Sequence, residues 1–508
     1  MPSTPSLLRA QPLAFALAVA LALPFANEAM AIPAVPLGSP AALPGTASSP
    51  RPDGSVLWSV ENCNDAGAGS LRDAAMHANH GDGIDLGSLS CSTISVTSGA
   101  ITLHDVELVG PGAAQLEIDG TGNQNHRIFN HAGAGGRLDI SGVTINGGIY
   151  ASNAGLGGGC LRSDGGSSLR ITDSVFRNCL VLTPVGQDGS ARGGAIASYG
   201  GGAVALYGTT LASNIARTDH EFADGGALYA QGSVILHRST LSNNSVSAIH
   251  PGPTSGTQGG GLFTRASVLI EDSTLDGNSA TRDAGAALVL GGGTLLRSTV
   301  SNNYAGAGTP GVVMVGNYNT AAGIYSSTIS GNASGQSTQW LSGGLYLGNA
   351  TTKIINCTVT GNSETNQVGT KFGAGIVFGQ DAVNVTMSGT ISSGNYFDDG
   401  EPPYASDDMD GPASVTFLGD SNLIGWSHLL PVPTDTIWDS DPRLGPLQSN
   451  GGPTRTHMPL SNSPAVDAGA AHGYDTDQRG SARIVGAAAD IGSVESGDTI
   501  FANAFDLP

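Results

Sequence analysis

The chain has 508 residues, of which 76 are glycine and only 12% are charged, and its formal net charge is −21. This balance argues against a nucleic-acid-binding protein, because neutralising phosphates requires clusters of Lys and Arg. Long helices are also disfavoured, since Lys353 and Lys371 are the only lysines and Ser, Thr and Asn fill the polar positions.

Residues 1–31 are typical of a secretory signal peptide. Arg9 precedes an apolar run at 12–25, and a small-x-small cleavage site follows at 29–31. A retained membrane anchor is the alternative, which Pro24 and the cleavage site disfavour. We therefore predict a protein that is secreted or held at the cell surface, with no transmembrane segment after cleavage.

A linker and an N-terminal cap are predicted next. Residues 32–54 carry six prolines and should form an extended linker. In the cap, residues 55–83, Ser70 can begin a helix with Asp73 at its third position. This helix would cover the first coil of the following domain with one apolar face, formed by Leu71, Ala74, Ala75 and Ala78.

One phrase recurs through the middle of the chain, as in "RSTLSNNSV" at 238–246. Its asparagine recurs every 25 to 34 residues, at Asn214, Asn244, Asn278, Asn303, Asn332 and Asn362, with Asn395 following. A glycine-rich phrase such as "GGALYA" (225–230) and an apolar phrase such as "SVILHRST" (233–240) complete each repeat. Apolar and polar residues alternate within each phrase, which is the period of a β-strand.

The repeats predict an all-β fold, a right-handed parallel β-helix over about residues 84–420. Each coil would contribute three short strands, one to each of three sheets. A propeller would need longer blades with an aromatic signature, helical repeats would need helix-forming residues, and ordinary hairpins would need a second strand within a few residues. The β-helix predicts one inward row made of Leu241, Leu275, Val300, Ile329 and Val359.

The repeated asparagine and the paired glycines predict the corners of the coils. Asn tolerates the left-handed backbone conformation, so we expect each repeated Asn to lie in a turn. Stacked Asn side chains would also hydrogen-bond one another in a ladder. The paired glycines would allow close backbone approach at another corner.

Five cysteines in a predicted secreted chain suggest two disulfides and one free thiol. Cys160 and Cys179 are separated by about one short coil, and Cys179 takes a position that Asn holds in other repeats. Cys63 and Cys91 lie on either side of the predicted cap helix. Cys357 occupies the inward position that serine holds elsewhere, so we predict a buried free thiol.

Several segments resemble a known family. "AGSLRDAAMHAN", "VELVGPGAAQLEIDG" and the "STISGN" repeats resemble secreted bacterial β-helix proteins that begin with a CSLREA-type segment. Gly69 stands here in place of the cysteine of that motif, and Asp73 in place of its Glu. Residues 421–495, with "SNLIGW" and "DPRLGPLQSNGGPTRTHMPLSNSPAVDAG", resemble the choice-of-anchor Q domain, and the tail 496–508 resembles a terminal "IFANGF" motif.

The resemblance implies a location, an architecture and no assigned reaction. Members are bacterial surface or extracellular proteins, similar in architecture to polymorphic outer-membrane proteins and to the pectate-lyase-like fold. By this resemblance the chain would be secreted or associated with the outer membrane, and 421–495 would be a small β-rich C-terminal domain.

Chemistry-bearing motifs are few. "SDDMDG" at 406–411 brings Asp407, Asp408 and Asp410 together, and such oxygen ligands suit Ca²⁺. The cluster lacks the closing Glu of an EF-hand, so a solvated loop is the alternative. A second acidic cluster lies at 397–401. No other cofactor is expected, and no catalytic residue is assigned, because the histidines look isolated along the chain: His77, His104, His126, His131, His220 and His237.

Two functions remain on this scaffold. The favoured one is a non-catalytic protein whose variable loops serve adhesion or the binding of a carbohydrate polymer or a host or matrix surface. The alternative is a polysaccharide lyase or glycoside hydrolase acting on acidic polysaccharide. An enzyme should carry a consistent row of acids or arginines on one face. The residues at the equivalent outward position do not carry charges of one sign: His237, Glu271, Arg297 and Asn356.

Overall fold

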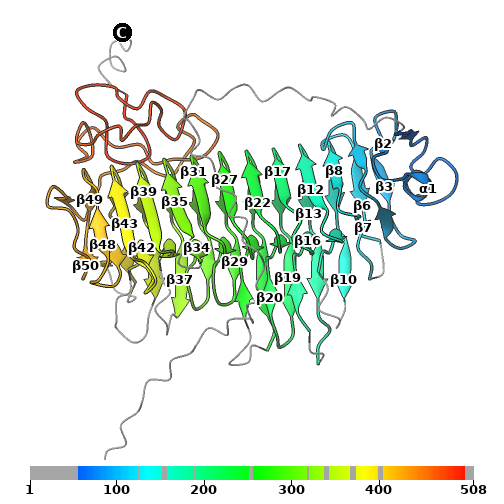
Figure 1. Cartoon of the computed structure of the whole chain (residues 1–508), viewed down its shortest axis with the longest axis horizontal. Helices are drawn as coiled ribbons and strands as arrows, with labels where there is room; N and C mark the ends of the chain where they lie inside the picture. The colour runs from blue at the N-terminus through cyan, green and yellow to red at the C-terminus, as the bar shows by residue number, and fades with distance from the viewer. Residues whose placement is uncertain are drawn as a thin grey trace, which may run out of the picture. The chain divides into compact units, whose positions relative to one another are not determined.

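A computed structural model describes residues 55–122, 125–151, 157–186, 189–250, 256–316, 320–336, 343–365, 373–398 and 404–497. The predicted signal peptide, the linker, most of the acidic cluster at 397–401 and the end of the tail lie outside these residues. The described chain is a parallel β-solenoid with a single short helix, which confirms the predicted fold class (Figure 1). In this part of the chain no helix is long and apolar enough to cross a membrane.

Sheet A runs the length of the solenoid, and its strands pair in parallel in the order of the chain (Figure 1). Its strands are β1 (Leu57–Ser59), β2 (Gly83–Asp85), β5 (Glu107–Val109), β8 (Arg137–Ser141), β12 (Ser168–Thr172), β17 (Val204–Tyr207), β22 (Val234–His237), β27 (Val268–Glu271), β31 (Gly293–Leu296), β35 (Ala321–Tyr325), β39 (Thr351–Ile355), β43 (Asn384–Ser388) and β48 (Thr416–Leu418).

Sheet B holds the strands of the repeated "STLS" phrase and follows sheet A in each coil. Its strands are β3 (Thr93–Ser95), β6 (Glu117–Asp119), β9 (Thr144–Asn146), β13 (Val175–Arg177), β18 (Thr210–Ala212), β23 (Thr240–Ser242), β28 (Thr274–Asp276), β32 (Thr299–Ser301), β36 (Thr328–Ser330), β40 (Thr358–Thr360), β44 (Ile391–Ser392), β49 (Leu423–Ile424) and β51 (Ile437–Trp438).

Sheet C closes each coil, and in many coils its strand follows the paired glycines. Its strands are β4 (Ile101–Leu103), β7 (Phe129–Ala132), β11 (Leu161–Asp164), β16 (Ile196–Ser198), β21 (Leu228–Ala230), β26 (Leu262–Thr264), β30 (Ala287–Val289), β34 (Val312–Val315), β38 (Leu345–Gly348), β42 (Ile376–Phe378), β47 (Met409–Asp410) and β50 (Ser427–His428).

Many coils contain a fourth strand, which the sequence did not predict. It forms sheet D between B and C, and three coils add a further strand of two residues, which belongs to sheet E. Sheet D comprises β10 (Ile149–Ala151), β14 (Leu180–Leu182), β19 (Ile215–Thr218), β24 (Ser245–Ala248), β29 (Ser279–Ala280), β33 (Tyr304–Ala305), β37 (Ala333–Gln336), β41 (Ser363–Thr365), β45 (Tyr396–Phe397) and β46 (Ala405–Ser406). Sheet E comprises β15 (Ala191–Arg192), β20 (Ala223–Asp224) and β25 (Thr257–Gln258).

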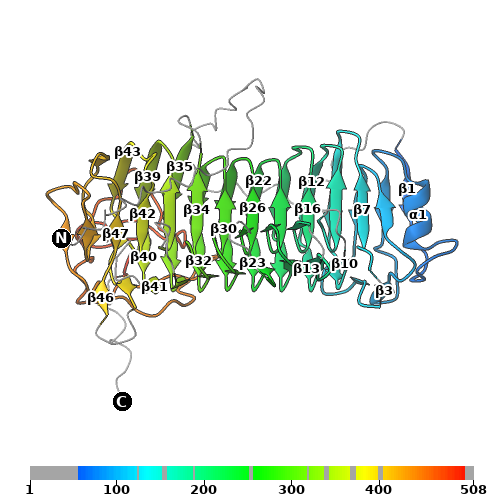
Figure 2. The same ribbon diagram turned by 90° about the horizontal axis from the view of Figure 1, so that it is seen from below.

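The core consists of rows of apolar side chains inside the coils. The predicted row is confirmed, because its members pair in register along sheet B and all are fully buried: Leu241, Leu275, Val300, Ile329 and Val359. At the N-terminal end, α1 (Leu71–His77) begins as predicted, with the Ser70 hydroxyl accepting a hydrogen bond from the Asp73 amide. Helix α1 buries Leu71, Ala74 and Ala75 at the end of the stack of coils (Figure 2).

The asparagine ladder forms, but its backbone differs from the prediction. The side-chain amide of each Asn donates to the amide oxygen of the next at 2.8–3.0 Å, from Asn214 to Asn395. The left-handed residue is the one before each ladder Asn, such as Asn243 (φ 54) or Gly277 (φ 67). The left-handed turn therefore lies one residue before the predicted position, because the ladder Asn has to direct its own side chain into the stack.

The paired glycines lie where the backbones of two coils approach closely, as predicted. Gly259 has a positive φ of 70. A Cβ added to Gly226 or Gly260 would overlap backbone carbonyl oxygens of adjacent segments. These positions therefore admit only glycine without a shift of the backbone.

Both predicted disulfides form, Cys63–Cys91 and Cys160–Cys179, and Cys357 is free and buried. The Cys179 amide donates to the Asn214 side chain at 3.0 Å, so this cysteine holds the first described position of the ladder. Burial raises the pKa of the Cys357 thiol to about 12. Cys357 therefore stays protonated and serves as a small core residue.

The C-terminal region, residues 441–497, contains isolated antiparallel bridges instead of long strands. Residues 421–438 still belong to the solenoid through β49, β50 and β51. The region covers the outer face of sheet B, where Thr328 donates to Gln478 at 2.6 Å and the Ser493 amide donates to Thr358 at 3.0 Å. It therefore packs along the side of several coils (Figure 1).

Candidate binding site

A cavity of about 600 Å³ opens on the outer face of sheet C, toward the C-terminal end of the solenoid. Its floor is a row of directly paired outward residues from β38, β42, β47 and β50: Tyr346, Val377, Asp410 and His428. Gln380, Gly411, Pro412 and Leu429 also line it. Strand alternation explains the row, because the neighbours Leu345, Leu347, Ile376 and Met409 point into the core.

The cavity combines aromatic rings with one carboxylate. His428 Nδ1 lies 3.3 Å from Asp410 Oδ1, and the His428 ring stacks on Trp426 at 5.7 Å between centroids. Burial raises the pKa of Asp410 and the pKa of Tyr346. The apolar side chain of Leu429 is 62% exposed at the rim. Such a surface can stack on the apolar face of a ligand and accept hydrogen bonds from its hydroxyls.

Asp410 is the one acid among the described residues that line this cavity. Glycoside hydrolases of the common type need two carboxylates on opposite sides of the bond that breaks. The described lining therefore supplies one of the two carboxylates that such a hydrolase requires.

The three aspartates proposed for Ca²⁺ lie in different surroundings. Asp410 faces the cavity, whereas Asp407 accepts hydrogen bonds from the Gly373 amide at 3.3 Å. Asp408 Oδ1 accepts from both the backbone and the side chain of Asn395 at 2.8 Å, which ends the asparagine ladder. Asp407 and Asp408 are fully buried, so the alternative of a solvated loop is wrong for them. Among the described residues, the groups with metal-ligand geometry are elsewhere.

The burial of Asp408 predicts that the stability of the folded protein depends on pH. Burial raises the pKa of Asp408 to about 6, from its ordinary value of 3.8. Because the folded protein holds this proton more tightly than the unfolded chain, the free energy of unfolding falls as the pH rises from about 4 to about 6. Asp408→Asn keeps the oxygen that accepts from Asn395, removes the charge and loses the oxygen that accepts from Ser406. Its stability relative to the parent should therefore be about 3 kcal/mol higher at pH 7 than at pH 4.

Thermal unfolding at the two pH values measures this effect. The matched control is Asp475→Asn, at an exposed aspartate of the C-terminal region, which should leave the melting temperature unchanged at both. The same effect of Asp408→Asn on stability at pH 4 and at pH 7 would contradict the raised pKa of Asp408.

The histidines are not isolated, contrary to the sequence analysis. Asp105 accepts from His80 and His131, each at 3.0 Å, and the second ring nitrogen of His131 lies 2.7 Å from Ser163 Oγ. Although burial alone would raise it, hydrogen bonds from Ala134, Ser167 and His131 hold the pKa of Asp105 at about 2.

This Ser–His–Asp arrangement is part of the core. Ser163 and His131 are buried inside the solenoid, so no substrate can reach the serine hydroxyl. Burial also lowers the pKa of His131. We assign the three residues to a satisfied polar network that replaces apolar packing in this coil.

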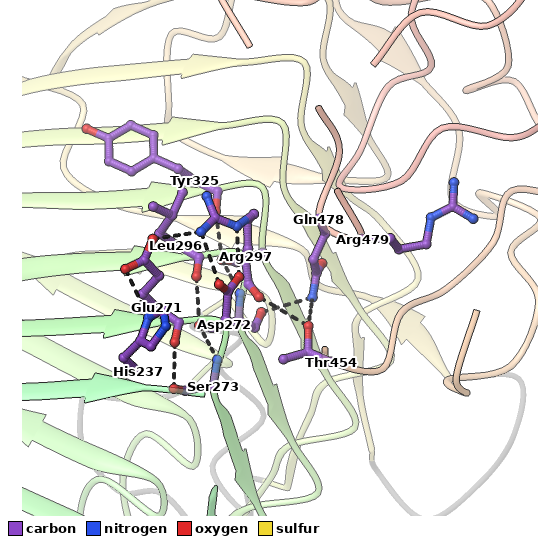
Figure 3. Close-up of polar contacts among 12 residues, drawn as sticks. His237, Glu271, Asp272, Ser273, Leu296, Arg297, Tyr325, Thr454, Gln478 and Arg479 are labelled. Carbon is purple, nitrogen blue, oxygen red and sulfur yellow. Dashed lines mark hydrogen bonds and ion pairs between the residues drawn. The ribbon is translucent and has the colours of Figure 1, made fainter. Parts of the chain in front are cut away.

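A second polar cluster lies at the corner between sheets A and B (Figure 3). Arg297 lies between Glu271, at 2.6 Å, and Asp272, at 2.8 Å, and Glu271 also contacts His237 at 3.3 Å. The register places Leu296 beside Glu271 and Arg297 one residue further on, so the row His237, Glu271, Arg297 and Asn356 read from the sequence is wrong.

The charges of this cluster are mutually neutralised. Although burial alone would lower it, the pairs with Asp272 and Glu271 raise the pKa of Arg297. Arg297 therefore cannot serve as a base, and it already supplies the cation that His237, Glu271 and Asp272 could otherwise bind. Thr454 donates to the Arg297 carbonyl at 3.1 Å and accepts from Gln478 at 2.9 Å, which joins this corner to the C-terminal region (Figure 3).

No family model, no curated protein and no solved structure matches this chain. The resemblance to the CSLREA and choice-of-anchor Q proteins therefore stays a prediction.

Proposed function

We propose that the protein is a secreted or cell-surface β-solenoid that binds a carbohydrate polymer without cleaving it. The observation that carries this proposal is the outward row of Tyr346, Val377, Asp410 and His428 along the floor of the cavity. At about 4.8 Å between neighbouring strands, the row spans about 14 Å, which is longer than one sugar ring.

The chemistry of the cavity favours a neutral polymer. Asp410 and the net charge of −21 would repel an acidic polysaccharide, whereas hydroxyl groups can donate to the Asp410 carboxylate. Tyr346 offers an aromatic face on which a sugar ring can stack. Two disulfides and the predicted signal peptide support an extracellular location.

Binding measurements on the purified full chain test the proposal. We expect soluble neutral glucans, mannans or xylans to bind, and polygalacturonate and alginate to bind more weakly. Tyr346→Ala and Asp410→Ala should each weaken binding by about tenfold or more. Tyr304→Ala, at an exposed tyrosine of sheet D, is the matched control and should bind as the parent does.

The alternative, a polysaccharide lyase or hydrolase, rests on the Asp410–His428 pair in the same cavity. The parent chain can be compared with Asp410→Ala for the release of reducing sugar or unsaturated uronate. Release by the parent that disappears in Asp410→Ala would show that the cavity is a catalytic site. Failure of every one of these polymers to bind would contradict both the binding function and the catalytic alternative.

A further inference from the structure

Two histidines occupy equivalent places in successive coils, at the end of sheet D. Thr218 of β19 pairs with Ala248 of β24, and the His250 amide donates to the Asp219 carbonyl at 2.9 Å. His220 and His250 therefore lie one strand spacing apart, with ring centroids separated by 5.4 Å. Their side chains are 46% and 60% exposed, so both can be reached from solvent.

A buried carboxylate lies between the two rings. His250 Nδ1 is 2.7 Å from Asp219 Oδ1, and His220 Nε2 is 3.2 Å from Asp219 Oδ2. The Gly186 amide also donates to Oδ2, and the Asp219 amide donates to Thr183 at 3.1 Å. The preceding coil therefore fixes the position of the carboxylate.

A carboxylate that is already held in place by the Gly186 amide can act as a ligand without an ordering cost.

We propose that Asp219, His220 and His250 bind one divalent transition-metal ion, with Zn²⁺ as the best match. One ligand atom from each residue lies within 4.8 Å of the other two. Adjacent ligands of an ion with bonds of about 2.0–2.1 Å are separated by roughly 2.9–3.4 Å. The nitrogen–oxygen separations of 2.7 and 3.2 Å are close to these values, so only small side-chain movements are needed.

The ligand atoms and the exposure of the two histidines determine which metal ions the site can bind. Two imidazoles with one carboxylate suit Zn²⁺, Co²⁺, Ni²⁺ and Cu²⁺, whereas Ca²⁺ and Mg²⁺ prefer oxygen ligands. Each neutral imidazole would offer the lone pair of the nitrogen nearest Asp219, and the proton now on that nitrogen would move through solvent to the other ring nitrogen. With three protein ligands and two solvent-exposed histidines, at least one coordination position stays open to water or to another molecule.

Titration of the full chain, free of any affinity tag, with Zn²⁺ and Co²⁺ tests the site. We expect one ion per chain by calorimetry and, for Co²⁺, the intense visible absorption of a low-coordinate ion. His220→Ala and His250→Ala should each weaken binding by about 100-fold, and Asp219→Asn should also weaken it. His77→Ala is the matched control, because it removes an exposed histidine paired with a single aspartate, Asp73.

Thermal unfolding of each variant without metal shows whether it is folded. Added Zn²⁺ should raise the melting temperature of the parent and of His77→Ala, but not that of His220→Ala or His250→Ala. Two results would overturn the proposal: no saturable binding of Zn²⁺ or Co²⁺ by the parent chain, or binding that persists unchanged in the folded His220→Ala and His250→Ala variants.

Discussion

Asn278→Leu should lower the free energy of unfolding by about 4 kcal/mol or more, and the melting temperature by about 10 °C. The Asn278 side chain donates to the Leu241 carbonyl at 2.8 Å and to Asn303 at 3.0 Å. Its oxygen accepts from the backbone and the side chain of Asn244 at 3.1 and 2.9 Å. Leucine has a similar size but satisfies none of these groups, and each buried group left without a partner costs about 1–3 kcal/mol.

The matched control is Asn384→Leu, which makes the same change at an exposed position of β43. Its stability should stay within about 0.5 kcal/mol of the parent. Circular dichroism during heating measures both variants. Equal melting temperatures for Asn278→Leu and Asn384→Leu would show that the ladder does not stabilise the solenoid.

Gly260→Ala should cost more than about 3 kcal/mol and reduce the yield of folded protein. A Cβ at this position would overlap the carbonyl oxygens of Gly285 and Ser279. Neither oxygen can move alone, because both belong to the backbone of the neighbouring coil. The distance between the two coils must therefore increase, and this would disturb the strand pairing between them in every sheet.

Gly122→Ala is the control for this substitution, because a Cβ there would meet only Thr97, at an ordinary 3.5 Å. Denaturant unfolding of the soluble fraction compares the two variants. If Gly260→Ala folded with the stability of Gly122→Ala, the close approach at this corner would not limit the fold.

The sequence predicts those features that repeat in every coil. Leu241 and Leu275 each lie three residues before a repeated Asn, in a strand where apolar and polar residues alternate. Aligning the repeats on that Asn therefore predicts which residues pair in the row. The fourth strand escapes prediction because its residues vary between coils, from "SVSA" in β24 to "YA" in β33. Its pairing comes from the stacking of neighbours and not from local propensity.

The candidate sites depend on register between coils of unequal length. Tyr346 and Val377 meet across 31 residues and Val377 and Asp410 across 33, with loops between them that follow no common pattern. The same applies to Asp219 and His250, and to His131 and Ser163. A histidine that looks isolated along the chain can therefore have a partner one coil away, and only the stacked structure reveals it.

The contacts of the C-terminal region have a mechanical consequence. A solenoid under tension peels coil by coil, because each coil is held only by its neighbours. Here Arg455, Gln478 and Ser493 fasten the same segment to four successive coils, at β28, β32, β36 and β40. A pull on residue 497 must first detach this segment from all four coils together. Extension then begins with one large rupture, and the smaller steps of single coils follow it.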